Sequence, residues 1–457
     1  MEASIKLAPT TEKDCASCLG MQRIVDMYTD DNLEFEFAAK DSEGGRRSSP
    51  HLSDKLLRFD DFGKKTRLIF TRFTSPDGAS RSVETFVNEF WTAKQRAASR
   101  LQEISYRACF KPQLPRFFIE LLTHRGATVY DPFMGRGTTL IEAALLGRVP
   151  FGCDINPLSA VLTRPRLNPP TARQIEDRLR EIPFDQPDEF PEDLLVFYHP
   201  ETLRQIAALR KYLIQLREAD SLDPIDDWIC VVALNRLTGH SPGFFSVYTM
   251  PPNQAVSVKS QRKINARRNQ TPSRRDVPAI LLKKSRQLLS DCTPATRKTV
   301  ASVAGRALLL TQPAAATPQI PDDSVDLVVT SPPFLDVVDY AGDNWLRCWF
   351  LGIDPKSVKL TVPKKLDQWT TAMAEVFQEL HRVLIPGGHV AFEVGEVRGG
   401  TIKLEEVVLP AGVAAGLTPR LVLINDQKFT KTANCWGVDN NFKGTNTNRI
   451  VVFHKAE

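Results

Sequence analysis

Two short motifs in this 457-residue chain combine residue types and spacings that could do chemistry. The first runs from Asp131 to Thr139 (DPFMGRGTT), and the second runs from Thr330 to Phe334 (TSPPF). The first joins a carboxylate to two glycines and two hydroxyls, a combination that suits the binding of a nucleotide-like cofactor. The second joins a hydroxyl to two stiff prolines and an aromatic ring, which suits the binding of a flat base.

The TSPPF motif could activate an exocyclic amine on a base. The lone pair of such an amine is delocalised into the ring, so the nitrogen is a poor nucleophile. The Ser331 hydroxyl oxygen and the Pro332 carbonyl oxygen can each accept one N–H, which favours a pyramidal nitrogen whose lone pair points at an incoming methyl group. Phe334 can stack on the extracted base. A strand-ending turn, which Pro-Pro pairs often mark, is the alternative interpretation.

The first motif follows an apolar stretch that predicts a buried strand. Residues 128–131 (TVYD) are β-branched or aromatic, and the two glycines of the motif allow a tight turn after them. Its two threonines are expected to cap a helix over residues 140–146. This order of strand, glycine turn and helix brings backbone N–H groups and the positive helix end towards a ligand.

A second carboxylate supports a cofactor at this turn. The next expected strand, residues 150–154, ends in Asp154, which lies 23 residues after Asp131. At this spacing a carboxylate can accept hydrogen bonds from ribose hydroxyls. The dehydrogenase pattern G-x-G-x-x-G is not matched, because Leu140 stands where its third glycine would be. A generic α/β turn is the alternative.

Composition sets wide limits on the class of protein. Hydrophobic residues make up 42% of the chain and charged residues 25%, which is typical of soluble globular proteins. We expect a cytoplasmic protein without a membrane partner, because no apolar run of about 18 residues occurs and no secretion signal is recognisable. Eight scattered cysteines form no disulfide framework, and the Cys15–Cys18 pair lacks a second pair at zinc-finger spacing, so we expect no metal.

The net charge of +5 hides an uneven distribution. Residues 1–50 are acidic and are expected to be a flexible lead-in. Between Lys259 and Arg286 the chain has ten basic residues and the single acid Asp276. A solvated helix face is one interpretation, and a phosphate-contacting surface is the sharper one. The residues expected to contact nucleic-acid phosphates are Arg262, Lys263, Arg267, Arg268, Arg274, Arg275, Lys283 and Lys284.

Together the motifs resemble those of the amino-directed DNA methyltransferases, which use S-adenosylmethionine to form N4-methylcytosine or N6-methyladenine. DPFMGRGTT matches the cofactor motif of that family, and SPPF matches its catalytic D/N/S-P-P-Y/F/W tetrad. Residues 110–115 (FKPQLP) resemble the family's segment before the cofactor strand. Residues 380–390 (LHRVLIPGGHV) resemble the helix, glycine turn and strand after the tetrad. The resemblance covers residues 105–165 and 300–455, about half of the chain.

The resemblance implies an α/β, Rossmann-like methyltransferase fold. It would have a mixed, mostly parallel sheet with helices on both faces and an inserted, largely helical target-recognition domain, since about 140 residues separate the ribose acid from the next catalytic strands. The expected domains are a partly flexible N-terminal extension (1–84), the first catalytic half (85–169), the inserted DNA-binding region (170–298) and the second catalytic half (299–457).

The resemblance also implies roles for single residues. Those expected to bind the cofactor are Lys111, Pro112, Asp131, Pro132, Phe133, Gly135, Gly137, Thr138, Thr139, Asp154 and Ile155. Asp154 would hold the ribose and Ile155 would lie against the adenine. Those expected to hold the target base are Ser331, Pro332, Pro333 and Phe334. The family often has an acid after its third strand, where this chain has Gln312 as a partial replacement.

The implied function is a sequence-specific DNA methyltransferase that acts on the N4 amine of a flipped-out cytosine. The Ser-Pro-Pro tetrad after Thr330 leans towards cytosine, and adenine N6 is the alternative. Double-stranded DNA is the expected partner, and a cognate restriction endonuclease could be a functional one. An RNA exocyclic-amine methyltransferase and a non-enzymatic specificity subunit are further alternatives.

Polar side chains of the insertion are expected to read base edges in the major groove. Some of the amides and guanidinium groups of the following set are expected to do so: Asn253, Gln254, Gln261, Arg262, Asn265, Arg267, Arg268, Asn269 and Gln270. His199 and His240 are expected to be structural, because methyl transfer from a sulfonium needs no strong base.

Overall fold

The structure is a computed structural model that describes residues 52–91, 98–106, 109–187, 189–250, 255–333, 340–354, 365–397, 402–426 and 447–457. The expected lead-in over residues 1–50, the Cys15–Cys18 pair, Asn253, Gln254 and Phe334 lie outside the described residues. The chain divides into two units, Met1–Leu52 and Ser53–Glu457, and the fold that follows is that of the second unit.

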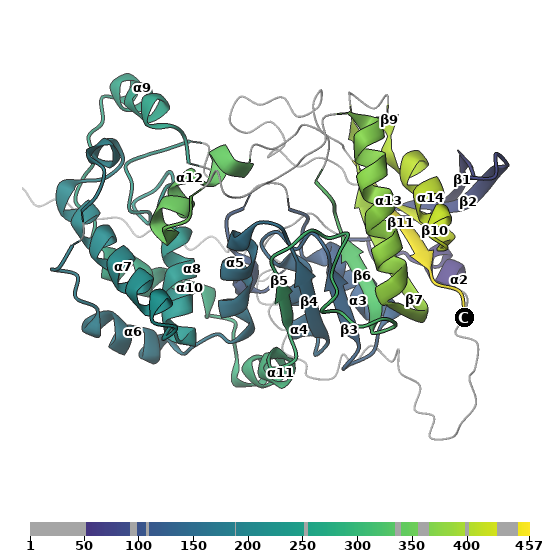
Figure 1. The fold of residues 1–457 in the computed structure, drawn as a ribbon, viewed down its shortest axis with the longest axis horizontal. Coiled ribbons are helices and arrows are strands. Elements are labelled where there is room, and N and C mark those ends of the chain that lie inside the picture. The colour runs from purple at the N-terminus through teal and green to yellow at the C-terminus, as the bar shows by residue number, and fades with distance from the viewer. Residues whose placement is uncertain are drawn as a thin grey trace, which may run out of the picture. The chain divides into compact units, whose positions relative to one another are not determined.

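A nine-stranded sheet forms the centre of this unit, in the order β1-β2-β10-β11-β7-β6-β3-β4-β5 (Figure 1). The strands are β1 (Arg67–Thr74), β2 (Ser80–Asn88), β3 (Thr128–Asp131), β4 (Val149–Cys153), β5 (Leu308–Leu310), β6 (Val325–Thr330), β7 (Leu384–Val394), β10 (Thr418–Asp426) and β11 (Thr447–His454). A separate pair consists of β8 (Glu396–Val397) and β9 (Ile402–Lys403).

Most neighbouring strands of the sheet are parallel. The run from β7 through β6, β3 and β4 to β5 is parallel throughout, and β2 is parallel to β10. The pairs β1/β2, β10/β11 and β11/β7 are antiparallel. The expected mixed, mostly parallel α/β sheet is therefore confirmed. Because the strands from β7 to β5 run in the same direction, their carboxyl ends share one border, which we call the carboxyl edge.

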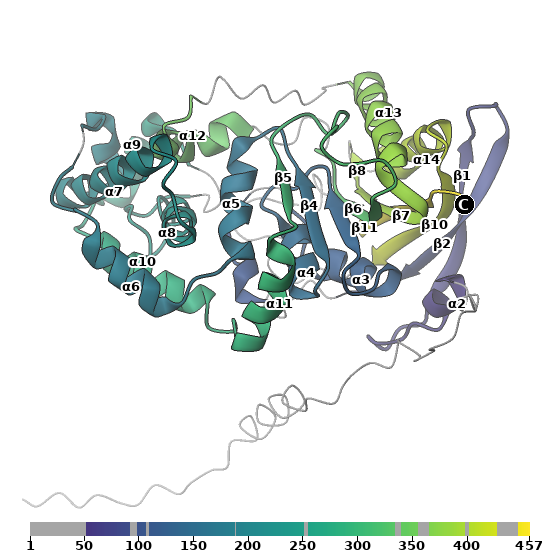
Figure 2. The same cartoon turned by 60° about the horizontal axis from the view of Figure 1, so that its bottom comes forward.

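Helices cover both faces of the sheet (Figure 2). They are α3 (Gln113–Leu122), α4 (Thr138–Leu145), α5 (Pro157–Leu167), α11 (Pro294–Ala304), α13 (Leu366–Val383) and α14 (Leu404–Ala414). Two short elements precede them, α2 (Leu52–Leu57) and the 3-10 turn η2 (Arg100–Gln102). The buried side chains Trp369 and Phe377 of α13 and Val408 of α14 pack on Val328 and Phe392 of the sheet.

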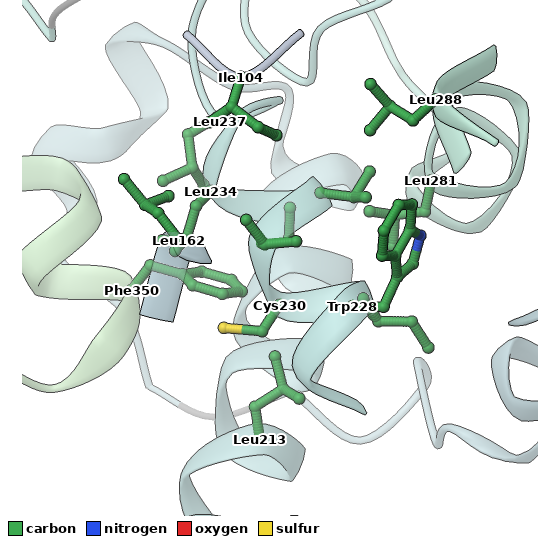
Figure 3. Close-up of a cluster of buried hydrophobic side chains, with 14 of the residues drawn as sticks. Ile104, Leu162, Leu213, Trp228, Cys230, Leu234, Leu237, Leu281, Leu288 and Phe350 are labelled. Carbon is green, nitrogen blue, oxygen red and sulfur yellow. The ribbon is translucent and has the colours of Figure 1, made fainter. Parts of the chain in front are cut away.

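A mostly helical unit stands beside the sheet. It contains α6 (Ala172–Glu181), η3 (Glu192–Val196), α7 (Pro200–Glu218), α8 (Pro224–Leu234), α9 (Val258–Arg268) and α10 (Val277–Leu288). Its core includes Trp228 and Cys230 of α8 with Leu281 and Leu288 of α10 (Figure 3). Leu162 of α5 belongs to the same cluster, so apolar packing joins this unit to the sheet layer.

A helix that follows the TSPPF motif in the sequence completes the helical unit. This contribution was not predicted from the sequence. Helix α12 (Tyr340–Leu351) contributes Phe350 to the cluster of Figure 3. Two arginines of α7 cap its C-terminal carbonyls: Arg210 Nε donates to Trp349 O at 2.9 Å and Arg217 donates to Leu351 O at 2.8 Å. The helical unit is therefore built from two separate stretches of the chain.

The start of the described chain is part of the large sheet rather than an appendage. β2 pairs with β10, and the side chain of Asn425 in β10 accepts the Phe90 N–H at 2.7 Å. The boundary expected between residues 84 and 85 falls inside β2. This strand is hydrogen-bonded to β1 on one side and to β10 on the other, so it belongs to the large sheet. The boundary expected between residues 298 and 299 falls inside α11.

The described residues contain neither a membrane-spanning helix nor a cluster of metal ligands. None of their helices is both long and apolar enough to cross a membrane. They also contain no group of three or more His, Cys, Asp or Glu side chains that could hold a metal ion.

Candidate active site

The two motifs meet at the carboxyl edge, because β3 and β6 are adjacent and parallel. Two hydrogen bonds join them directly. The Thr330 hydroxyl at the end of β6 donates to Asp131 Oδ1 at 2.6 Å. The Thr139 hydroxyl in the first turn of α4 donates to the Val329 carbonyl at 3.1 Å. Stretches about 200 residues apart in the sequence thus form one site.

The glycine turn after β3 is shaped by close packing against α5. Gly137 has a φ of +75°, and a Cβ added to it would lie 2.3 Å from Thr163 Oγ1. Gly135 also has a positive φ of +49°, yet the nearest atom to an added Cβ is the Tyr106 ring at 3.8 Å. Gly135 therefore leaves open space beside the turn, whereas Gly137 has to be a glycine because α5 packs closely against it.

The expected capping role of the two threonines is wrong. The N-cap of α4 is Gly137 itself, and no side chain caps this helix. The Thr138 hydroxyl accepts a hydrogen bond from Arg136 Nε at 3.1 Å, and the Thr139 hydroxyl binds Val329. A glycine in the left-handed conformation occupies the capping position, so the hydroxyls are free to make contacts across elements.

Asp154 follows β4 and holds the glycine turn in place. Its Oδ2 accepts the Gly135 N–H at 2.9 Å, and its Oδ1 accepts the Asn156 N–H at 2.9 Å. Burial raises the pKa of Asp154, and these two backbone donors oppose the rise. The adjacent Ile155 is 37% exposed, which is unusual for an isoleucine. A carboxylate and an apolar surface therefore lie side by side at this strand end.

Asp131 is the most deeply buried acid of the site, with 1% of its surface exposed. Burial raises the pKa of its carboxyl to about 7, although the Thr330 hydroxyl and the Phe133 N–H oppose that rise. A cationic group placed near it would favour the ionised form.

The segment after β6 is anchored through its second proline. The indole N–H of Trp369 in α13 donates to the Pro333 carbonyl at 3.0 Å, and Trp369 is fully buried. The Pro333 carbonyl is therefore already hydrogen-bonded to Trp369. The Pro332 carbonyl is the other proline carbonyl of the motif. Ser331 is half-buried, and the buried Glu393 of β7 lies beside it, because Thr330 pairs with Phe392 across β6 and β7. Sequence analysis found neither Trp369 nor Glu393, since both lie in apolar stretches that look purely structural.

Three further residues come from the segment before α3. Pro112 is the N-cap of α3, and burial lowers the pKa of the preceding Lys111. Tyr106, which the sequence analysis missed, lies beside Gly135, and its hydroxyl accepts from Asn156 Nδ2 at 3.3 Å. Its position just before the FKPQLP stretch was the one signal that could have indicated it.

Gln312 follows β5 and lies next to Asp154. Its backbone N–H donates to the Asp154 carbonyl at 3.2 Å. Its side-chain nitrogen donates to Ala316 O and to Gln319 Oε1, both at 2.8 Å. These bonds leave the side-chain oxygen of Gln312 as the group suited to accept an amine N–H.

The structure separates the predicted basic block into exposed and buried members. Those with exposed side chains are Arg262, Lys263, Arg267, Arg268, Arg274 and Lys283. Arg275 is half-buried, and Lys284 is buried in an ion pair with Glu103 at 3.2 Å. Lys284 therefore cannot face a phosphate at the surface. In both Figure 1 and Figure 2, α9 lies apart from α10 within the helical unit.

The amides expected to read bases are internal instead. Gln261 is fully buried and donates to the Tyr248 carbonyl at 3.0 Å. Gln270 donates to the same carbonyl, and both glutamines donate to Asn265 Oδ1. Asn265 in turn donates to Val196 O at 2.8 Å. The expectation of base contact is wrong for the buried Gln261, whereas Asn265 and Gln270 are half-buried; all three hold α9 against the preceding loop. His199 caps α7 through Nδ1, a structural role as expected.

Comparison with known proteins agrees with this site. The N6/N4 methyltransferase family, described as DNA methylase, matches residues 52–160. The type II methyltransferase M.BsoBI of Geobacillus stearothermophilus is 24% identical over 285 residues, covering 56% of this chain and 53% of that protein. M.MvaI of Kocuria varians is 31% identical over 97 residues, covering 21% of this chain and 20% of that protein.

The chain thus spans about half the length of M.BsoBI and less of M.MvaI. The solved structure of TrmN from Thermus thermophilus has a TM-score of 0.30 at 11% identity, covering 78% of this chain and 51% of that one, a likeness too weak to bear on the fold.

Fold and site define an α/β protein in which a glycine-rich cofactor turn meets a Ser-Pro-Pro segment at one edge of the sheet. Residues 52–160 match the N6/N4 DNA methylase family, and the chain as a whole is similar to type II DNA methyltransferases of that family. The resemblance inferred from the motifs is confirmed at this level.

Proposed function

We propose that this protein is a site-specific DNA methyltransferase. It transfers a methyl group from S-adenosylmethionine to the exocyclic N4 amine of a flipped-out cytosine, in a restriction-modification system. The observation that best supports the proposal is the hydrogen bond from Thr330 to Asp131 at 2.6 Å. It places the end of the Ser-Pro-Pro strand against the end of the cofactor strand, where donor and acceptor of a methyl group have to meet.

The residues at the carboxyl edge fit S-adenosylmethionine. The open space beside Gly135, the Asp154 carboxylate and the exposed Ile155 suit its methionine part, its ribose hydroxyls and its adenine. The raised pKa of the buried Asp131 indicates an acid that a cationic ligand would ionise. When bound, the cofactor supplies an electrophilic methyl group on a sulfonium.

The groups proposed to hold the cofactor are those expected from the motifs. They are Lys111, Pro112, Asp131, Pro132, Phe133, Gly135, Gly137, Thr138, Thr139, Asp154 and Ile155. Thr138 and Thr139 act in this set by fixing the turn against Arg136 and Val329 rather than by capping α4.

On the base side, the Ser331 hydroxyl and the Pro332 carbonyl accept the two amine hydrogens, and Phe334 stacks on the ring. The Trp369 bond to Pro333 holds this segment in place before the base arrives, so little reorganisation is needed during the reaction. The preference for cytosine rests on the Thr-Ser-Pro-Pro resemblance. Adenine needs the same two acceptors.

The product of the reaction tests the proposal. Incubation of the protein with unmodified DNA and S-adenosylmethionine, followed by digestion to nucleosides and mass spectrometry, is expected to yield N4-methylcytosine. N6-methyladenine would move the assignment to the other branch of the family. Methylation of RNA without any methylation of DNA would contradict the proposal.

We also propose that the exposed basic face of α9 contacts DNA phosphates. Arg274 and Lys283, which follow α9 in the sequence, are exposed as well. Lys263 and Arg267 are exposed, and none of the ion pairs among the described residues includes either of them. Each phosphate contact contributes about 0.9 to the slope of log affinity against log salt concentration.

The double variant Lys263→Ala/Arg267→Ala is therefore expected to weaken DNA binding and to reduce the salt slope by about 2. Fluorescence anisotropy titrations at about 50 to 200 mM salt measure the DNA affinity and its salt slope. Arg173→Ala is the control, because Arg173 is a 92% exposed arginine on α6. An equal loss in the control, or an unchanged slope in the double variant, would argue against contact through α9.

A further inference from the structure

The backbone of Ser105 joins the helical unit to the cofactor side of the protein. Its N–H donates to Oδ1 of Asn235, the residue that ends α8, at 2.7 Å. Its carbonyl accepts from Nη2 of Arg347 in α12, also at 2.7 Å. The helical unit therefore holds both backbone groups of one residue, and it does so from each of the two stretches of chain that build it.

The residues on either side of Ser105 contact the glycine turn after β3. The Ile104 carbonyl accepts from Nη1 of Arg136, which stands between the two glycines of that turn, at 2.7 Å. The Tyr106 ring lies 3.8 Å from a Cβ placed on Gly135, and Tyr106 is buried. Three consecutive residues thus span the distance from the helical unit to the open space beside the turn.

Arg347 is fixed in place by several contacts. Only 9% of the residue is exposed. Its Nη1 donates to Oδ1 of Asn344, which precedes it in α12, at 2.6 Å. Its guanidinium carbon lies 5.8 Å from the centroid of the Tyr106 ring. An apolar side chain of similar volume would fill this place with a smaller desolvation cost, so the hydrogen bonds of Arg347 indicate a requirement for a defined geometry.

We propose that Arg347 is a positioning residue for S-adenosylmethionine. By holding the Ser105 carbonyl it fixes Tyr106 as the wall beside Gly135, where the methionine part of the cofactor fits. This role rests on the cofactor site of the proposed function. Because α12 follows the Ser-Pro-Pro motif, the chain that leads away from the base-holding segment sets one wall of the cofactor site. Such a linkage is reciprocal, so a cofactor that orders Tyr106 also orders α12.

Arg347→Met tests this role, because methionine is a long side chain without donors. Its affinity for S-adenosylmethionine, measured by calorimetry without DNA, is expected to be about 10-fold weaker than that of the parent. Arg347→Lys keeps a charged donor and is expected to recover part of the loss. Arg210→Met is the matched control and is expected to keep the parent affinity, because Arg210 also donates to a backbone carbonyl, that of Trp349 in α12.

Hydrogen exchange provides a measurement that needs neither a variant nor turnover. Saturating S-adenosylmethionine is expected to slow amide exchange in α12 of the parent, although no residue of α12 belongs to the proposed cofactor set. Arg347→Met is expected to lose this added protection, and Arg210→Met to keep it. Unchanged exchange in α12 of the cofactor-bound parent would overturn the inference, whether or not the variants fold.

Two results with the variants would also overturn it. One is parent affinity in a folded Arg347→Met protein, and the other is an equal loss of affinity in Arg210→Met. Failure of the proposed function would look different. A parent that binds S-adenosylmethionine and shows the α12 protection, yet forms no N4-methylcytosine, would contradict that function and leave the role of Arg347 intact. A parent that binds no S-adenosylmethionine would contradict both.

Discussion

Ser331→Ala is expected to lower the single-turnover rate of methyl transfer about 1000-fold and to leave the affinity for S-adenosylmethionine unchanged. This is the size of effect seen when one preorganised hydrogen-bonding group is removed from a reacting centre. The change deletes one of the two acceptors proposed to make the amine nitrogen pyramidal. It leaves the cofactor turn intact, because that turn is held by Asp154 and Thr330.

Rapid-quench kinetics with labelled cofactor measures the rate, and calorimetry measures the affinity. Ser324→Ala is the control, since Ser324 precedes β6 and its hydroxyl donates only to the nearby Pro321 carbonyl at 2.7 Å. If Ser331→Ala keeps the parent rate, the proposed role of the tetrad is wrong. A loss of cofactor affinity in Ser331→Ala would indicate that the serine supports the cofactor site instead.

Gly137→Ala is expected to destabilise the protein more than any other single methyl addition at the site. The residue has a φ of +75°, where a side chain costs about 1–3 kcal/mol. The new Cβ would also lie 2.3 Å from Thr163 Oγ1, and overpacking of this kind costs about another 1–3 kcal/mol. A lower urea midpoint and weaker cofactor binding are the expected results.

A matched glycine separates these two costs. Gly126 has a φ of +87° and nothing within 4 Å of an added Cβ, so Gly126→Ala carries backbone strain alone. The difference between the variants measures the contact with α5. Adding Thr163→Ala to Gly137→Ala should recover most of that part, because it removes Oγ1 and Cγ2 and leaves only the Thr163 Cβ at 3.0 Å. Equal losses in the two single variants would mean that Thr163 moves aside easily.

The sequence predicted those strands whose pattern lies within a few neighbouring residues. The strand over residues 128–131 was predicted with the bounds that the structure has, and the strand expected over residues 150–154 differs from β4 by one residue at each end. Both are short stretches followed by turn residues, so the local pattern determines them without tertiary contacts.

The failures depend on contacts that the sequence does not encode locally. Gln261 and Asn265 have the chemistry of base-reading amides, but packing turns them inward. Lys284 belongs to a basic block by sequence and to an internal ion pair with Glu103 by structure. Glu393 looked like an ordinary strand residue, because Ser331 is 62 positions away and is brought near only by the β6/β7 pairing.

The origin of α12 limits how this protein could be recombined with its relatives. The helical unit is closed by a helix that the chain reaches only after Ser331, and α7 secures that helix through the carbonyls of Trp349 and Leu351. The unit is therefore not a single cassette of sequence. Transplanting residues 172–288 alone would deprive Arg210 and Arg217 of their partners, so any exchange of this region must also carry the stretch downstream of the Ser-Pro-Pro motif.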